Sequence, residues 1–123
     1  MGTRPRVILV DDHPGFVKAL GRVLSPDCDV VGVIADGREV ADAAARLHPV
    51  VIVLDVNLPN VNGLDLCRQL TRNNPQVKII VISALADDAT RDEALAAGAS
   101  GFFHKFAADE LSVAIRRVWE EST

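Results

Sequence analysis

The stretch from Val50 to Leu54 reads Val-Val-Ile-Val-Leu and is followed directly by Asp55. Three other runs are similarly rich in valine and isoleucine, namely Val7 to Val10, Val30 to Ala35 and Val77 to Ile82. Strands that stay apolar on both faces are typical of a parallel sheet that helices cover on each side. We therefore predict a strand in each run and a weaker fifth strand at Gly101 to His104.

The segments between these runs carry apolar residues at helical spacing. The first helix would present Phe16, Leu20, Val23 and Leu24, and the last Leu111, Ala114, Ile115 and Val118. Residues suited to helix N-caps precede four of the segments: Asp12 or His13, then Asp36, then Asn62, then Asp87 or Asp88. The expected chain order is therefore a strand followed by a helix, repeated five times.

This alternation predicts an α/β fold with right-handed crossovers. Five such strands most often form a doubly wound parallel sheet, the flavodoxin-like (βα)5 arrangement with strand order 2-1-3-4-5. Ligands of such sheets bind outside the carboxyl ends of the strands, where the order reverses between the first and third strands. That edge is where chemistry is expected.

Length and composition narrow the class of protein. The 123 residues, 49% hydrophobic and 24% charged with a net charge of −4, suit a single domain over residues 1–123. No apolar run is long enough to span a membrane, and the N-terminus does not resemble a signal peptide. No run of basic residues favours binding to nucleic acid. We therefore expect a cytoplasmic chain that itself binds neither membrane nor nucleic acid. Cys28 and Cys67 lack the spacing of a zinc or redox site.

Acidic residues follow two of the predicted strands. Asp11 and Asp12 come directly after Val10, and Asp55 comes directly after Leu54. The fold would bring these carboxylates into one crevice, where like charges must raise a pKa or bind a cation. Oxygen ligands favour Mg²⁺, with Mn²⁺ as the alternative. Asp11 and Asp12 alone would fit helix capping equally well.

Two further polar residues end the remaining strands. Ser83 closes the fourth strand and Lys105 closes the fifth. Separately they fit a helix cap and a surface charge, but beside the aspartates they indicate a phosphoryl site with a hydrogen-bond donor and a cation. Asp55 would then be free to act as a nucleophile and form an acyl phosphate.

Over nearly its whole length the chain resembles the receiver domain of bacterial two-component response regulators. The residues that carry the resemblance are Val10-Asp11-Asp12-His13-Pro14, Leu54-Asp55-Val56-Asn57-Leu58-Pro59 with Gly63, Ser83-Ala84, Gly98-Ala99-Ser100-Gly101-Phe102 and Lys105. Receiver domains are flavodoxin-like signalling domains that accept a phosphoryl group from a sensor histidine kinase. The resemblance implies that function here.

The resemblance also implies roles for individual residues. Asp55 corresponds to the phosphoacceptor. Asp12 and Asp11 correspond to the Mg²⁺-binding pair, Asp12 directly and Asp11 through water, and the backbone carbonyl of Asn57 to a third protein ligand. Lys105 corresponds to the lysine that contacts the acyl phosphate.

The remaining matched positions belong to the switch and the turn. Ser83 corresponds to the hydroxyl that swings toward the phosphoryl group, and Phe102 to the aromatic residue that rotates inward behind it. A plain core aromatic is the alternative for Phe102. Pro59 and Gly63 fit the turn after the acceptor strand.

The chain departs from the family pattern at two positions. Many receivers have a proline held cis after the lysine, whereas Phe106 follows Lys105 here, which puts the cis peptide in question. Phe102 stands where other receivers have tyrosine, so its ring has no hydroxyl that could form a hydrogen bond in one state of the switch. Neither change touches the metal or acceptor positions, so we expect phosphorylation to be retained.

Other function classes fit less well. A Mg²⁺-dependent aspartyl-phosphate phosphatase places a second acid two residues after its nucleophile, and here that residue is Asn57. A nucleotide or flavin binder would show a glycine-rich motif after the first strand, which instead carries Asp-Asp-His-Pro. We therefore expect a signalling domain that promotes its own phosphorylation and dephosphorylation.

The output of the switch is a separate question. The Gly-Ala-Ser-Gly-Phe pattern before Lys105, without a following proline, resembles receivers that precede a LuxR-type helix-turn-helix domain, so transcription is the expected output. A stand-alone regulator acting by protein contact is the alternative. The resemblance implies a phosphorylation-dependent homodimer, formed through the first and last helices or through the face of the fourth helix, fifth strand and fifth helix.

Overall fold

The computed structural model describes residues 4–122, in which five strands form one parallel sheet in the order β2-β1-β3-β4-β5. The strands are β1 (Arg6–Val10), β2 (Asp29–Ile34), β3 (Val51–Asp55), β4 (Lys78–Ser83) and β5 (Gly101–His104). The helices are α1 (Pro14–Leu24), α2 (Val40–Leu47), α3 (Gly63–Asn73), α4 (Asp88–Ala96) and α5 (Ala108–Ser122), with a short 3-10 helix, η1 (Gly37–Glu39), before α2. The predicted flavodoxin-like fold and strand order are confirmed.

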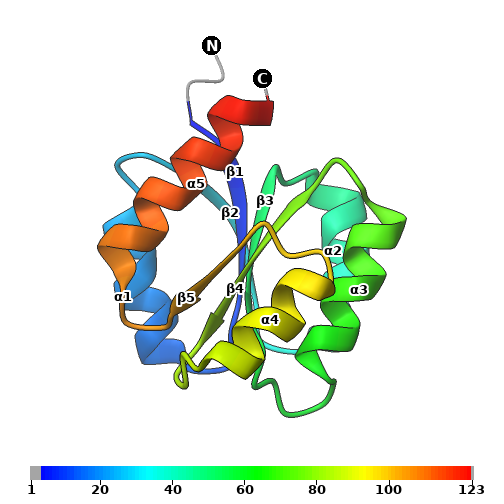
Figure 1. The fold of residues 1–123 in the computed structure, drawn as a ribbon. Coiled ribbons are helices and arrows are strands. Elements are labelled where there is room, and N and C mark those ends of the chain that lie inside the picture. The colour runs from blue at the N-terminus through cyan, green and yellow to red at the C-terminus, as the bar shows by residue number, and fades with distance from the viewer. Residues whose placement is uncertain (1–3, 123) are drawn as a thin grey trace.

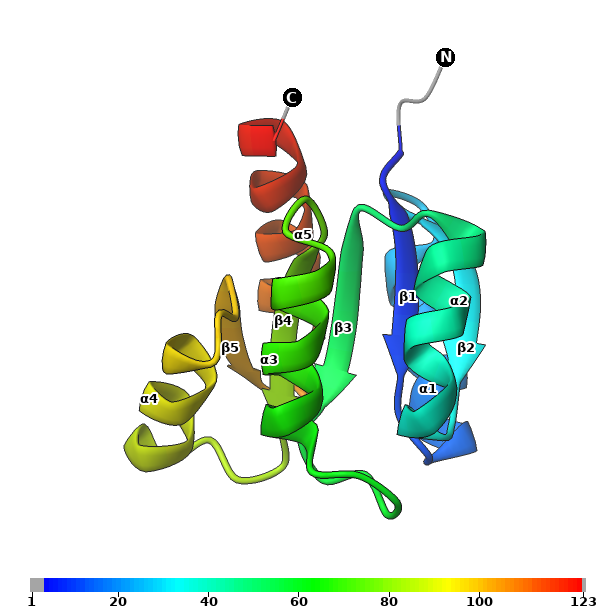
Figure 2. The same cartoon turned by 90° about the vertical axis from the view of Figure 1, so that its right-hand side faces the viewer.

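Helices cover both faces of the sheet. Figure 1 shows α1 and α5 on one side and α2, α3 and α4 on the other, and Figure 2 shows the same layers from the side. Successive residues of the central strands enter opposite cores: Ile8, Ile52 and Ile79 pack under α2, α3 and α4, and Val7, Val51 and Ile80 under α1 and α5. This two-sided burial is why the central strands contain uninterrupted apolar runs.

The helix starts agree only in part with the predicted caps. Asn62 accepts hydrogen bonds from the amides of Leu64 and Asp65 at the start of α3, and Asp87, not Asp88, caps α4. Asp36 caps η1, so the prediction that it caps the second long helix is wrong. A 3-10 turn lies between Asp36 and α2, and the Arg38 amide within that turn donates to Asp36 Oδ1 at 2.9 Å.

The start of α1 has no side-chain cap, contrary to the expectation for Asp12 or His13. His13 is the N-cap residue by backbone conformation, but its own amide donates to Asp11 Oδ1 at 2.8 Å. Pro14 occupies the first turn, where the missing N–H costs nothing because that group would have no partner inside the helix. The carboxylate after β1 thus fixes the start of the helix from outside it.

Two loops lie at the carboxyl edge of the sheet, and the first of them, between β3 and α3, requires glycine at one position. A Cβ on Gly63 would lie 2.5 Å from the Cα of Val56, so only glycine allows the β3–α3 loop to pass this close to β3. The Lys105–Phe106 peptide is trans, and no cis peptide occurs in residues 4–122.

Within residues 4–122, no helix is long and apolar enough to cross a membrane.

Candidate functional site

Within the described residues, only four polar or charged side chains are buried: Asp11, Asp55, Ser83 and Lys105. Asp55 and Ser83 are the last residues of β3 and β4, and Asp11 and Lys105 directly follow β1 and β5. Because the strands are parallel, their carboxyl ends lie along one edge of the sheet, the edge toward which the arrowheads point in Figure 2. The fold therefore concentrates its buried polar groups at one place, as the strand pattern predicts.

Lys105 lies between the two buried carboxylates. Its Nζ is 2.8 Å from Asp11 Oδ2 and 3.1 Å from Asp55 Oδ2. Burial by itself would lower the pKa of Lys105, but the hydrogen bonds and charges of Asp11 and Asp55 outweigh it, so the pKa lies above its usual value. The lysine is therefore a permanent cation in this site.

The two carboxyl groups respond differently to the same surroundings. Burial raises the pKa of Asp55, assisted by the nearby charge of Asp11 and opposed by the Asn57 amide, 2.9 Å from Oδ1, and by Lys105. Burial also acts to raise the pKa of Asp11, but hydrogen bonds from Lys105 and His13 outweigh it and hold that pKa below its usual value. Two aspartates with one lysine leave the site short of one positive charge when both are ionised.

The oxygen atoms of the site suit a divalent cation. Asp11, Asp12, His13 and Asp55 each offer one ligand atom, and these atoms all lie within 4.8 Å of one another. Asp11 Oδ2 and Asp12 Oδ1 are buried, and each contacts one nitrogen: Lys105 Nζ lies 2.8 Å from the first and His13 Nδ1 lies 3.3 Å from the second. Buried carboxylate oxygens beside an excess negative charge fit Mg²⁺ or Mn²⁺, which prefer such ligands.

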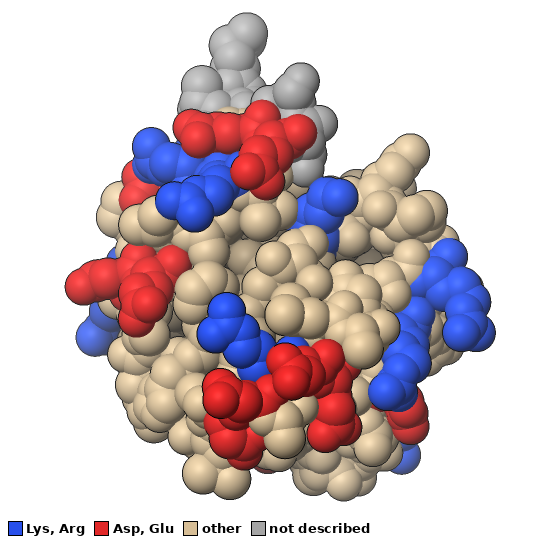
Figure 3. Space-filling model, in the orientation of Figure 1, with Lys and Arg blue, Asp and Glu red and all other residues tan. Residues whose placement is uncertain are grey.

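Exposed acidic residues elsewhere lack these features. Figure 3 shows acidic side chains gathered over α4, where Asp87, Asp88, Asp92 and Glu93 are all exposed. Solvated carboxylates need neither a cation nor a raised pKa, because water screens their charges. Burial is therefore what distinguishes the cluster at the sheet edge.

The remaining predicted residues line the same edge or its loops. Ser83 Oγ accepts the Leu85 amide at 3.1 Å. Phe102 is half-buried and packs against the core under α2, α3 and α4. Asn57 and Pro59 are exposed on the β3–α3 loop, and Gly63 is buried at the start of α3.

The structure adds two residues from the start of α1 that the sequence interpretation left out of the site. His13 Nδ1 lies 2.8 Å from Lys105 Nζ and 2.9 Å from Asp11 Oδ1, although position alone indicated only a helix start. The Phe16 ring centroid lies 4.6 Å from Lys105 Nζ, although its spacing indicated only a core position. Adjacency to the acidic pair was the one available signal for His13, and none existed for Phe16.

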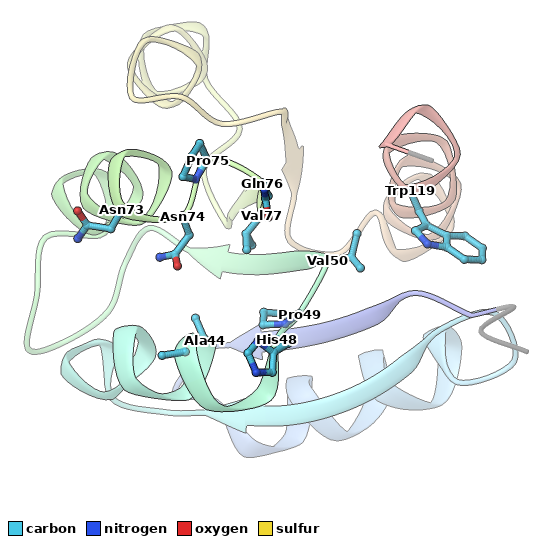
Figure 4. A pocket seen from close by; sticks show the side chains of 11 residues that line it. Ala44, His48, Pro49, Val50, Asn73, Asn74, Pro75, Gln76, Val77 and Trp119 are labelled. Carbon is cyan, nitrogen blue, oxygen red and sulfur yellow. The ribbon is translucent and has the colours of Figure 1, made fainter.

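A groove without Asp, Glu, Lys or Arg side chains lies at the other end of the sheet. This groove, of about 810 Å³, opens at the amino end of the sheet, between the loop after α2 and the loop after α3 (Figure 4). No Asp, Glu, Lys or Arg side chain lines it, and Trp119 of α5 is half-buried at its side. The groove therefore lacks the carboxylates and the lysine that meet at the carboxyl edge.

Comparison with known proteins identifies the class of the chain. Residues 7–116 match the family described as the response regulator receiver domain. The chain is 34% identical over 116 residues to the transcriptional regulatory protein DegU of Brevibacillus brevis, covering 92% of this chain and 49% of DegU. It is 40% identical over 107 residues to the DNA-binding transcriptional activator DevR/DosR of Mycobacterium tuberculosis, covering 81% of this chain and 47% of that protein. The chain thus spans about half the length of these curated relatives.

Solved structures agree with this assignment. The receiver domain of the putative response regulator NarL from Mycobacterium tuberculosis superposes with a TM-score of 0.88 at 28% identity, covering 95% of this chain and 97% of that one. The response regulator domain of Thermotoga maritima CheB gives a TM-score of 0.87 at 31% identity, with 95% and 97% coverage. By sequence, fold and strand order, this chain belongs to the family of response regulator receiver domains.

Proposed function

We propose that residues 1–123 form one receiver domain that works as a phosphorylation-dependent switch, in which Asp55 accepts a phosphoryl group from a sensor histidine kinase in a Mg²⁺-dependent reaction. The observation that carries the proposal is the buried Asp55 carboxylate with Lys105 Nζ 3.1 Å from one oxygen and the Asn57 amide 2.9 Å from the other. A nucleophile held by two donors has a fixed orientation toward an incoming phosphorus.

The transfer forms one bond and breaks one. A carboxylate oxygen of Asp55 attacks phosphorus, and the bond from phosphorus to the donor's imidazole nitrogen breaks with its electron pair left on nitrogen. The product is an acyl phosphate, and its later attack by water regenerates Asp55 and releases inorganic phosphate. Lys105 pairs with a phosphoryl oxygen and thereby stabilises charge that the carboxylate alone would repel.

The same residues would hold the metal ion. Asp11, Asp12 and Asp55, with the backbone carbonyl of Asn57, are the proposed ligands for Mg²⁺, and Mn²⁺ would fit the same oxygens. When bound, the ion supplies the positive charge that neutralises phosphoryl oxygens. The buried oxygens of Asp11 and Asp12 support this assignment, because each of these residues has a carboxylate oxygen within 4.8 Å of an Asp55 oxygen.

The switch would run through the ends of β4 and β5. Ser83 Oγ accepts the Leu85 amide, so a hydroxyl that turns to donate to a phosphoryl oxygen draws the β4–α4 loop with it. The half-buried Phe102 ring would move inward into the space that this loop leaves. We therefore propose the β4–α4 loop with the α4–β5–α5 face as the element that has two states.

The output is proposed to be transcription through a DNA-binding domain outside these residues. Two relatives are named as a transcriptional regulatory protein and a DNA-binding transcriptional activator, and this chain covers about half of each. Phosphorylation would promote a homodimer, with α1 and α5 or the α4–β5–α5 face as its interface. Val23 of α1 is 40% exposed and Leu95 of α4 is 45% exposed, and each helix belongs to only one of the two faces, so Val23→Asp and Leu95→Asp variants would distinguish the faces by sedimentation.

The direct test is intact mass after incubation with acetyl phosphate and Mg²⁺. We expect a gain of one phosphoryl group that is lost in Asp55→Asn and with EDTA, and retained in Asp42→Asn, an exposed aspartate on α2 that serves as the matched control. A folded wild-type chain that gains no mass would overturn the proposal. So would equal labelling of Asp55→Asn, because phosphate would then reside on another residue.

A further inference from the structure

Lys105 is held from α1 as well as from the sheet. Its Nζ lies 2.8 Å from His13 Nδ1 and over the ring of Phe16, 4.6 Å from the centroid. Asp11 Oδ2 and Asp55 Oδ2 add two carboxylate contacts to the same ammonium group, at 2.8 Å and 3.1 Å. The Phe16 ring is the one partner that holds the charge without using a donor.

This difference matters when a phosphoryl oxygen arrives. The oxygen competes with Asp11 and Asp55 for the N–H groups of Lys105. A neutral ring holds the ammonium through the attraction of its π face, so it neither competes for a donor nor repels the incoming anion as a carboxylate does. The ring contact can therefore persist while the hydrogen bonds of Lys105 change partners.

A second aromatic residue braces Phe16. The Phe106 ring meets the Phe16 ring edge-on, with centroids 5.8 Å apart and planes at 88°. Phe106 is 70% exposed, so burial does not hold it there. Its amide donates to His104 Nδ1 at 3.1 Å, a bond that a proline at this position could not form. The residue after Lys105 thus ties the β5–α5 loop to α1.

We propose that Phe16, braced by Phe106, is a positioning residue for phosphoryl transfer, holding the Lys105 ammonium beside Asp55 while its hydrogen bonds are exchanged. The inference rests on the proposed phosphorylation of Asp55. It assigns a role at the site to a departure from the family pattern, because Phe106 replaces the usual proline.

The first measurement is the rate of phosphorylation by acetyl phosphate at saturating Mg²⁺, followed by intact mass. Phe16→Leu keeps an apolar side chain but removes the π face, and we expect about 10-fold slower labelling. Phe16→Tyr keeps the ring and should restore a rate near that of the wild type. Phe106→Leu removes the brace and keeps the amide, and we expect a loss of about 3-fold. Trp119→Leu, which removes a half-buried aromatic ring at the opposite end of the sheet, is the matched control and should label normally.

The second measurement reports the contact itself. The ε-methylene protons of Lys105 should show an upfield ring-current shift by NMR in the wild type and Phe16→Tyr, lost in Phe16→Leu, while urea midpoints show that each variant is folded. If Phe16→Leu is phosphorylated at the wild-type rate, or if Phe16→Leu and Phe16→Tyr are slowed by the same factor, this inference alone is overturned. A wild-type chain that is not labelled at all would overturn the proposed function together with it.

Discussion

The two ends of the sheet have the same backbone but opposite chemistry. At the carboxyl end, four buried polar side chains meet, and two carboxylates share one ammonium group. At the amino end, a groove is lined by amide, proline, histidine and apolar side chains (Figure 4). The site of chemistry is therefore marked by buried, paired charges and not by the size of a hollow.

Buried titratable groups show the same contrast. Burial raises the pKa of the Cys28 and Cys67 thiols to about 11, and no cation offsets it enough to keep either thiolate. Burial acts in the same direction on Asp11, yet Lys105 and His13 keep its pKa low. A buried group stays charged only where the fold supplies a counter-charge.

The largest effect should come from removing that counter-charge. Lys105→Met leaves Asp11 and Asp55 buried without a cation, so we expect the free energy of unfolding to fall by about 3 kcal/mol in urea titrations without Mg²⁺. Added Mg²⁺ should restore part of the loss. Lys78→Met, at the amino end of β4, should change stability by less than about 0.5 kcal/mol. Equal stability of the two variants would show that the charges at the carboxyl end are not coupled.

The thiols test burial without a counter-charge. With pKa values near 11 against 9.0 for an ordinary cysteine, each folded thiol carries about 100-fold less thiolate at neutral pH. We expect Ellman's reagent to react with Cys28 and Cys67 at least that much more slowly than with the chain in urea. Because the folded state holds these protons more tightly, the free energy of unfolding should also decline as pH rises from 9 toward 11. Fast labelling of the folded chain would contradict the burial of both.

A smaller effect is expected from the loop that carries the acceptor. Gly63→Ala places a methyl group against the Val56 backbone, and we expect a loss of about 2 kcal/mol with slower phosphorylation, because Asp55 adjoins the displaced segment. Gly21→Ala in α1 meets no atom within 4 Å and should instead stabilise the chain by about 0.5 to 1 kcal/mol. Urea titrations of both variants measure the difference. A neutral Gly63→Ala would mean that the loop can move away freely.

The smallest effect should follow a charge placed in the groove. Gln76 is exposed at the amino end, so Gln76→Lys should change stability by less than about 0.5 kcal/mol and leave Asp55 labelling unchanged. Thermal unfolding and intact mass check both. A marked loss of labelling would break the contrast between the two ends, because it would couple the groove to the phosphoryl site.

Most of the fold and the core of the site could be predicted from particular residues. Wholly apolar runs indicated a covered parallel sheet, and the residues that end those runs indicated where Asp11, Asp55, Ser83 and Lys105 would meet. The cap residues Asn62 and Asp87 were also predictable, because capping depends on neighbours two or three positions away. The missing cap of α1 was not, since Asp11 turns back to the His13 amide only once β1 is in place.

The sequence by itself determined which strands are buried and which side chains stand at their carboxyl ends, because both follow from residue order along a chain that alternates strand and helix. Only the tertiary structure decided that His13 and Phe16 contact Lys105, which lies more than 85 residues further along the chain, and that Phe106 packs against Phe16. Such contacts depend on how α1 and the β5–α5 loop pack across the sheet edge. No local pattern encodes that packing, because its energy comes from groups brought together only when the whole fold forms.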